Sequence, residues 1–362
     1  DNQKRHQFER ELKELKNIKA KTILGKHDPH DFLQADMIIK NPGIRRNNPF
    51  LLQAVENNAV IDTPCGIFSE IHPKPFIGIT GTKGKSYTTH LTSHLIKSFL
   101  PKTLAAGNNC ISPLRYVHET DRTFVLELSS WQLYEMGLHQ KSPHVACWLN
   151  FFPDHMNYYS ETNEYLKDKY NITKYQDRNS IIVLPWNHSF HKSLPIQAQK
   201  IYFDTNPDSH LPQKTEQGCF IRNKQLTLRD RDNEIKLLDI RDLPGEFQCP
   251  QHLTSLVAST AILMAYEEYT GSFTLTVDPL IRAISNFPGL SHRYKTIIHN
   301  NAYHIINDSA ASTPESTLMA IESIQKLPLI LILGGGGHKN LDYRKLSDRL
   351  IFQHITSIVF KD

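Results

Sequence analysis

A glycine-rich segment that ends in lysine and serine has the residue types needed to bind the phosphates of a nucleotide. It joins an apolar run at residues 76–80 to an expected helix that begins at Lys85. Glycines allow backbone N–H groups to turn toward phosphate oxygens, and the first turn of a helix favours negative charge. In such loops the lysine reaches the β- and γ-phosphates and the serine hydroxyl binds Mg²⁺. The sequence therefore predicts an ATP site made of Gly81, Thr82, Lys83, Gly84, Lys85 and Ser86.

Two further polar residues follow apolar runs that read as buried strands. Glu127 follows the run at 123–126, and His155 comes shortly after the run at 145–149. The carboxyl ends of parallel strands meet at the crevice where α/β proteins bind ligands. Mg²⁺ in phosphate sites takes one or two carboxylates together with phosphate oxygens, so Glu127 is a candidate metal ligand. The other interpretation of Glu127 is a residue of a helix-capping Glu-Ser-Ser turn.

These residues need a scaffold, and the chain alternates short apolar runs with amphipathic helices, a pattern typical of parallel α/β sheets. The expected strands cover residues 22–24, 37–39, 60–61, 76–80, 123–128, 145–149, 181–184, 303–306, 328–333 and 355–360. The expected helices cover residues 8–15, 49–57, 85–100, 253–269, 278–286 and 313–325. Residues 186–245 read as polar and turn-rich, with weak strand signals at 201–203 and 219–221. We predict α/β domains at 1–74, 75–290 and 291–362.

Bulk composition limits the possible partners and compartments. A formal charge of +4 and a pI near 8.6 are too small to indicate nucleic-acid binding. No apolar run approaches the roughly 18 residues that span a bilayer, so no membrane association is expected. The five cysteines are scattered and form no CxxC pair, which favours reduced thiols in a cytoplasmic protein. The chain begins inside an expected helix and ends after an expected strand, so we expect both terminal domains to be incomplete.

The form Thr-Gly-Thr-Lys-Gly-Lys-Ser at residues 80–86 resembles the phosphate loop of the Mur ligase superfamily, which also includes folylpolyglutamate synthases. The resemblance implies three domains: a Rossmann-like domain for the UDP-linked substrate, a central P-loop ATPase domain with a parallel sheet, and a Rossmann-like C-terminal domain. It also implies an activity. Members of this family activate a carboxylate as an acyl phosphate, which an amine then attacks.

Within this family, the segment Glu127-Leu-Ser-Ser-Trp-Gln-Leu133 is similar to that of the D-glutamate-adding member. The resemblance implies an ATP-dependent ligase that joins D-glutamate to UDP-N-acetylmuramoyl-L-alanine (UDP-MurNAc-L-Ala) in peptidoglycan biosynthesis. It implies that Ser129 and Gln132 contact substrate. It further implies two Mg²⁺ ions, a cytoplasmic location and a monomer.

Other motifs that match the family carry residue roles by resemblance alone. His155 matches the ligand of a second metal ion, and Lys169 matches a lysine that is carbamylated to bridge the metals. Arg293, in Phe-Pro-Gly-Leu-Ser-His-Arg, matches an arginine on the ATP side, and Asp308 matches the residue that holds the ribose. Lys85, His155, Lys169 and Arg293 are thus the expected catalytic residues. The expected substrate contacts are Asn41, Pro42, Gly43, Asn108, Ser129, Gln132 and Lys339.

Three positions depart from the family pattern. Asn157 replaces an aspartate, Lys295 a glutamate, and Ala310 a lysine beside the expected ribose residue. A missing cation at position 310 would remove stabilisation of the reacting phosphate. Two alternatives therefore remain open. One is a sister ligase for another amino acid or a folate, and the other is a non-catalytic protein that binds nucleotide or UDP-sugar.

Overall fold

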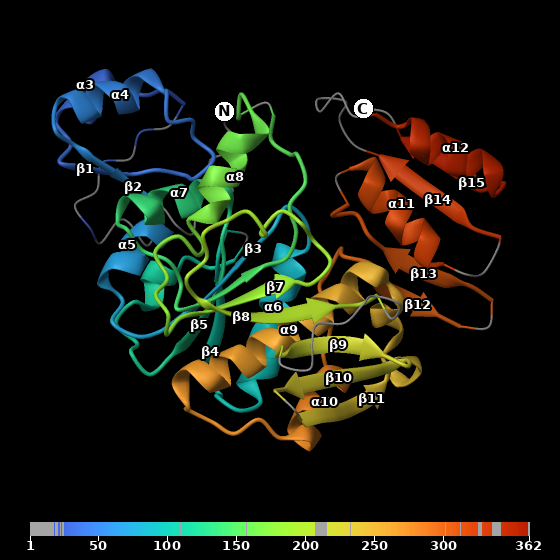
Figure 1. Cartoon of the computed structure of the whole chain (residues 1–362). Coiled ribbons are helices and arrows are strands. Elements are labelled where there is room, and N and C mark those ends of the chain that lie inside the picture. Colours follow the sequence, from blue (N-terminus) through green and yellow to red (C-terminus); the bar gives the residue numbers. More distant parts are fainter. Residues whose placement is uncertain are drawn as a thin grey trace. The chain divides into compact units, whose positions relative to one another are not determined.

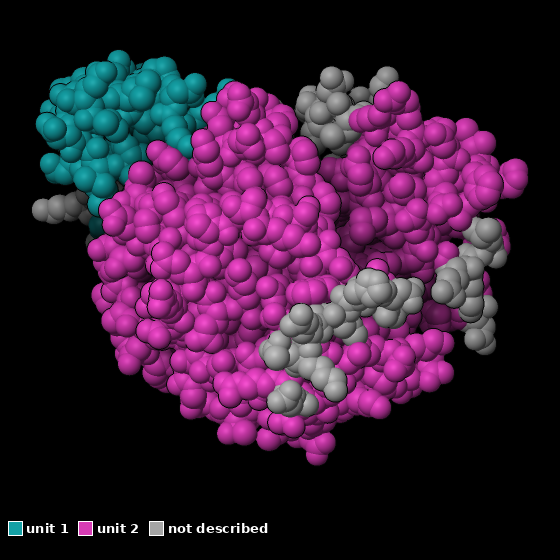
Figure 2. All heavy atoms as spheres, in the orientation of Figure 1, with its two compact units in different colours: residues 1–64 teal, residues 65–362 magenta. Residues whose placement is uncertain are grey.

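The computed structural model describes residues 18, 21, 23, 25–108, 110–156, 158–206, 216–231, 233–300, 302–311, 313–324, 328–334 and 342–360. The chain forms two compact units, Asp1–Pro64 and Cys65–Asp362 (Figure 2). The division into three domains at residues 75 and 291 stays a prediction. No helix among the described residues is both long and apolar enough to span a bilayer.

The first unit contains a small parallel sheet and two short helices. Strands β1 (Met37–Ile39) and β2 (Val60–Asp62) pair in parallel, as the sequence predicts. Helices α3 (Pro29–Leu33) and α4 (Pro49–Glu56) accompany them, and the Asn48 side chain caps α4 by accepting from Phe50 N at 3.0 Å. The predicted helix at 8–15 lies outside the described residues, as does most of the predicted strand at 22–24.

The second unit is built on a nine-stranded sheet in the order β11-β10-β9-β8-β7-β6-β3-β5-β4 (Figure 1). Its strands are β3 (Ile77–Thr80), β4 (Thr103–Gly107), β5 (Thr123–Glu127), β6 (Val145–Trp148), β7 (Ile181–Pro185), β8 (Gln199–Asp204), β9 (Gly218–Arg222), β10 (Gln225–Asp230) and β11 (Asn233–Asp239). The strands from β4 to β9 run parallel, and β10 and β11 are antiparallel to their neighbours. Because the central strands are parallel, their carboxyl ends share one edge, where the site lies.

Helices cover both faces of the central part of this sheet, so every residue of β3, β5, β6 and β7 is buried. On β6, Val145 and Cys147 face one hydrophobic core, and Ala146 and Trp148 face the other. The helices are α5 (Pro64–Ile71), α6 (Lys85–Lys97), α7 (Ser130–Leu138), α8 (Thr162–Tyr170), α9 (Pro250–Thr270) and α10 (Val277–Ser285), with 3-10 turns at Pro113–Tyr116, Ile240–Asp242 and Gly245–Gln248. The α6 and α9 side chains fill the first core, and those of α5 and α7 fill the second.

The last part of the second unit forms two small sheets and two helices. Strands β12 (Lys295–His299) and β13 (His304–Asn307) form an antiparallel pair, and β14 (Ile330–Gly334) and β15 (Thr356–Phe360) form a parallel pair. Helices α11 (Pro314–Ser323) and α12 (Arg344–Phe352) pack beside them. Buried Ile321, Leu346 and Ile355 form a small core of their own.

The prediction for residues 186–245 was wrong in one respect. The weak strand signals at 201–203 and 219–221 are confirmed by β8 and β9, but β10 and β11 also form there. In β10 apolar and polar residues alternate, and Thr227 and Arg229 are buried as well as Leu226 and Leu228. Such a strand contains no continuous apolar run, so composition alone does not predict it.

Candidate active site

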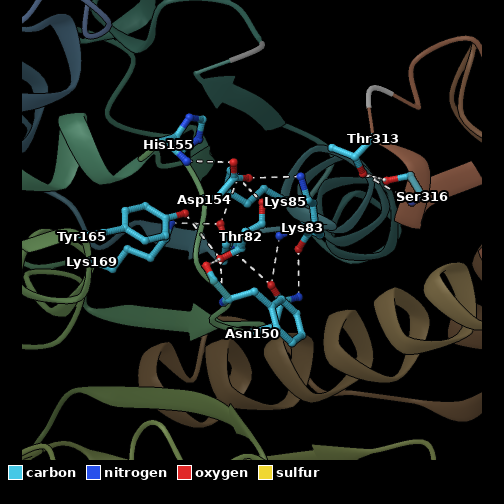
Figure 3. Close-up of polar contacts among 12 residues, drawn as sticks. Thr82, Lys83, Lys85, Asn150, Asp154, His155, Tyr165, Lys169, Thr313 and Ser316 are labelled. Carbon is cyan, nitrogen blue, oxygen red and sulfur yellow. Dashed lines mark hydrogen bonds and ion pairs between the residues drawn. The ribbon is translucent and has the colours of Figure 1, made fainter. Parts of the chain in front are cut away.

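The phosphate loop lies between the end of β3 and the start of α6. Gly84 caps α6 with φ +86°, a left-handed conformation that favours glycine. Lys85 follows as the first residue of α6 and folds back over the loop. Its Nζ donates to Gly81 O at 2.9 Å and to Thr82 O at 3.1 Å (Figure 3). The ammonium therefore lies at the loop, where a bound phosphate would meet it.

Asn150 holds the loop in place, a role that the sequence analysis missed. Its Oδ1 accepts from Thr82 N at 3.0 Å and from Lys83 N at 2.9 Å, and its Nδ2 donates to Lys83 O at 3.0 Å (Figure 3). Asp154 also contributes, because it forms an ion pair with Lys83 Nζ at 3.1 Å. The signal available in the sequence was the position of both residues just beyond β6, at the carboxyl edge of the sheet.

Glu127 and Asn108 lie together at the same edge of the sheet. Glu127 is the last residue of β5 and is fully buried. Asn108 donates from Nδ2 to Glu127 Oε1 at 3.1 Å and from its backbone N to Glu127 O at 2.9 Å. Gly107, with φ +105°, makes this approach possible, because a Cβ there would lie 2.3 Å from Glu127 O. The structure thus brings the predicted metal ligand beside one predicted substrate contact.

Lys169 and His155 approach the loop from the other side. Lys169, on α8, is 1% exposed, and its Nζ donates to Thr80 Oγ1 at 3.2 Å and to Gly81 O at 3.0 Å. The His155 ring lies between Trp131 and Tyr165, with centroids 4.9 and 5.9 Å away, and its φ is +59°. A left-handed conformation is uncommon for histidine and often marks functional positions.

Three of the predicted catalytic residues have lowered pKa values. Burial lowers the pKa of Lys85, the negative charge of Glu127 opposes that shift, and the positive charge of Arg293 adds to it. Burial also lowers the pKa of Lys169 well below its ordinary value, and the nearby charge of Lys85 lowers it further. The pKa of His155 is lowered mainly by burial, so its imidazole stays neutral and able to bind a metal at neutral pH.

Ser129 and Gln132, predicted to contact substrate, form the capping box of α7. Gln132 N donates to Ser129 Oγ at 3.3 Å, and Ser129 N donates to Gln132 Oε1 at 2.9 Å. Gln132 Nε2 also donates to Cys65 Sγ at 3.2 Å. Ser129 and Gln132 are 7% and 3% exposed. These side chains therefore have a clear structural role, and their contact with substrate stays a prediction.

Arg293 and Asp308 lie in the part of the chain that follows α10. Asp308 Oδ1 accepts from Tyr294 N at 2.9 Å, and burial raises the pKa of Asp308. The charge of Arg293 lowers the pKa of both Lys85 and Asp308. Lys295 donates to Pro288 O and lies near Glu246, whose pKa it lowers against the effect of burial.

The remaining predicted residues belong to the first unit or lie outside the described residues. In the first unit, Gly43 N donates to Asn41 Oδ1 at 3.0 Å in a turn that contains Pro42. Lys339, predicted to bind D-glutamate, and Asn157 lie outside the described residues. Their roles therefore stay predictions.

The donors near the loop suit a magnesium–phosphate site. Glu127 supplies a buried carboxylate and Ser86, in the first turn of α6, supplies a hydroxyl, which is the set that Mg²⁺ takes beside phosphate oxygens. Among the described residues, no three His, Cys, Asp or Glu side chains gather to hold a metal by themselves. A metal ion at the loop would therefore need phosphate oxygens as further ligands. A metal ion at Lys169 would need the amine to be modified.

A doubly covered parallel sheet with this loop after β3 defines a nucleotide-binding α/β protein of the P-loop type. Residues 79–250 match the Mur ligase middle domain. The UDP-N-acetylmuramoylalanine–D-glutamate ligase of Borreliella afzelii (strain PKo) is 30% identical over 90% of this chain and 67% of its own length. The enzyme of the same name from Roseiflexus sp. (strain RS-1) is 28% identical over 97% and 74%.

Solved structures show the same fold. The MurF ligase from Thermotoga maritima in complex with ADP superposes with a TM-score of 0.56 at 14% identity, over 92% of this chain and 89% of that one. The UDP-N-acetylmuramate–alanine ligase MurC from the same organism gives 0.57 at 16% identity, over 93% and 79%. The chain belongs to the Mur ligase family, and the predicted fold class is confirmed.

Proposed function

We propose that this chain is an ATP-dependent ligase that joins D-glutamate to UDP-MurNAc-L-Ala in peptidoglycan biosynthesis. The observation that carries the proposal is the phosphate loop of a Mur ligase middle domain, with buried Glu127 and exposed Asn108 hydrogen-bonded at the same sheet edge. The names of the two relatives above support D-glutamate as the amino acid. A cytoplasmic, monomeric enzyme is part of the same proposal.

The phosphate loop organises the first chemical step. Lys85 Nζ, now bonded to Gly81 O and Thr82 O, exchanges these carbonyls for oxygens of the β- and γ-phosphates of ATP. The carboxylate of the L-alanyl group attacks the γ-phosphorus in line, the bond to the β-phosphate oxygen breaks, and ADP leaves. Arg293 stabilises the charge that develops on the transferred group. The product is an acyl phosphate.

Amide formation follows. The amine of D-glutamate attacks the acyl carbon, the tetrahedral intermediate releases inorganic phosphate, and the amine loses a proton. Lys339 binds a carboxylate of D-glutamate, and Asn108 orients the muramoyl substrate beside Glu127. Asn41, Pro42 and Gly43 contact the UDP group, and Asp308 holds the ATP ribose.

Two magnesium sites complete the proposal. Ser86 and Glu127 would hold one ion, and His155 and carbamylated Lys169 would hold the other. Bound Mg²⁺ neutralises the charge of the phosphates and of the developing acyl phosphate. Carbamylation needs a neutral amine, and the lowered pKa of buried Lys169 favours that form.

The test is release of inorganic phosphate by the complete protein with ATP, UDP-MurNAc-L-Ala and a panel of amino acids. The proposal predicts release with D-glutamate and little with L-glutamate, other amino acids or folate. Release with a different amino acid would identify a sister ligase. ATP binding without release would identify a non-catalytic homologue, as the alanine at position 310 would permit.

A further inference from the structure

Three buried aromatic rings run from the phosphate-loop helix to the segment that carries Arg293 and Asp308. Tyr87, His252 and Tyr294 are 3%, 6% and 7% exposed. They come from three separate places: the first turn of α6, the first turn of α9, and the segment before β12. We call these three residues the aromatic column.

The rings contact one another directly. The Tyr87 and His252 rings stack, with centroids 3.7 Å apart and planes 14° apart. The Tyr294 and His252 rings make an edge-to-face contact, with centroids 5.8 Å apart and planes at 89°. The edge-to-face contact is a favourable arrangement of aromatic rings, whereas the Tyr87–His252 pair has almost no offset at 3.7 Å and is held mainly by the burial of both rings.

Hydrogen bonds fix the column at two of its members. His252 Nδ1 lies 3.0 Å from Glu246 O. Burial lowers the pKa of His252 to about 4, so the ring is neutral at neutral pH and Nδ1–H donates to that carbonyl. Tyr294 OH accepts from Ser323 Oγ at 2.6 Å, and Tyr294 N donates to Asp308 Oδ1 at 2.9 Å.

The two ends of the aromatic column lie next to residues that the proposed function assigns to ATP binding. Tyr87 directly follows Ser86 and is two residues from Lys85. Tyr294 directly follows Arg293, and its backbone N donates to the Asp308 carboxylate. Tyr294 also has φ +45°, an uncommon conformation for a residue with a large side chain, so surrounding contacts must hold it.

We propose that Tyr87, His252 and Tyr294 are positioning residues that set Arg293 and Asp308 relative to Lys85 and so determine affinity for ATP. The inference rests on the ATP site of the proposed function and deepens it. The column touches no reacting atom. It acts by fixing the position of Asp308, which would bind the ribose, relative to Lys85, which would bind the phosphates of the same nucleotide.

The experiment compares Tyr87→Leu, which removes the stacked ring, with Tyr87→Phe, which keeps it. The dissociation constants of ATP and of UDP-MurNAc-L-Ala are measured by calorimetry on the complete protein. Tyr87→Leu is expected to weaken ATP binding about tenfold, the equivalent of one well-placed hydrogen bond, and to leave UDP-MurNAc-L-Ala binding unchanged. Tyr87→Phe is expected to bind both ligands as the wild type does.

The control removes a ring from α9, the helix that carries His252. Tyr269 lies at the far end of α9 beside His144, with centroids 5.8 Å apart, and Tyr269→Leu is expected to leave ATP affinity unchanged. Asp308→Asn gives a second check. The double variant with Tyr87→Leu is expected to lose less free energy of ATP binding than the sum of the two single variants. Substitutions in residues that act through the same contacts are not additive.

Three outcomes would overturn the inference: unchanged ATP affinity in Tyr87→Leu, an equal loss for both ligands, or strict additivity with Asp308→Asn. Thermal unfolding of each variant identifies general loss of folded protein, and His252→Leu, which removes the other ring of the stacked pair, replaces Tyr87→Leu if that variant does not fold. Failure of the proposed function is a separate result. In that case the wild type would bind ATP with the predicted dependence on Tyr87 but release no phosphate with D-glutamate.

Discussion

Replacing Lys169 with methionine is expected to stabilise the folded protein near neutral pH and to abolish ligation. The Lys169 amine is 1% exposed, and burial and the charge of Lys85 hold its pKa well below the ordinary 10.5. The folded state therefore binds the proton less tightly than the unfolded chain does. The stability associated with Lys169 is complete above pH 10.5 and is lost as pH falls toward the lowered pKa.

The size of the effect follows from this linkage. Between the lowered pKa and 10.5, wild-type stability relative to Lys169→Met should rise by about 1.4 kcal/mol for each pH unit. Methionine has a similar length and no ionisable group, so the variant lacks this dependence. The variant loses the hydrogen bonds to Thr80 Oγ1 and Gly81 O, each worth about 1 kcal/mol, which reduces its advantage.

The assay is urea unfolding from pH 7 to 9.5, followed by fluorescence, in buffer free of CO₂ and divalent metal. Trp148, fully buried in β6 of the same sheet, reports on this part of the molecule. Parallel stability curves for wild type and Lys169→Met would refute the argument that Lys169 is buried as a neutral amine. Ligase activity should fall by at least about 10²-fold, because an anion that stabilises the bound metal is removed. Full activity in Lys169→Met would refute the metal-bridging role.

Three further predictions concern single positions. Lys85→Ala should lower the rate of phosphate release about 10²- to 10³-fold, because the interaction with the transferred phosphate is lost. Thermal unfolding should change only modestly, because the loss of the hydrogen bonds to Gly81 O and Thr82 O, each worth about 1 kcal/mol, is offset by removal of a buried amine. Gly107→Ala should destabilise the protein by about 1–3 kcal/mol, measured by urea unfolding, because its Cβ would lie 2.3 Å from Glu127 O; an unchanged midpoint would contradict this. Iodoacetamide should modify Cys110 before the other four cysteines, which are all buried, and peptide mass spectrometry should detect this order.

The sequence was most informative where function depends on residues next to one another in the chain. The loop Gly81–Ser86 carries its own glycines, lysine and serine, so its place between β3 and α6 was predictable. Glu127 could be placed at the carboxyl end of a strand by the same reasoning. Local patterns of this kind need no knowledge of tertiary packing.

Long-range partners could not be predicted in this way. Asn150 bonds to loop residues 67 and 68 positions earlier, and that contact exists only because β3 and β6 are neighbours in the sheet. The stack of Tyr87 on His252 likewise depends on how α6 packs against α9. Ser129 shows the opposite case, because its capping contact with Gln132 is local and agrees with the helix-capping turn that the sequence offered as the other interpretation of this segment.

The most direct test of the account measures which substrates the complete protein requires to release inorganic phosphate and to form a new product. The account predicts release that needs ATP, Mg²⁺, UDP-MurNAc-L-Ala and D-glutamate together, with a product that mass spectrometry shows to be larger by one glutamyl residue. Equal release with L-glutamate or another amino acid, or release that does not need UDP-MurNAc-L-Ala, would contradict it.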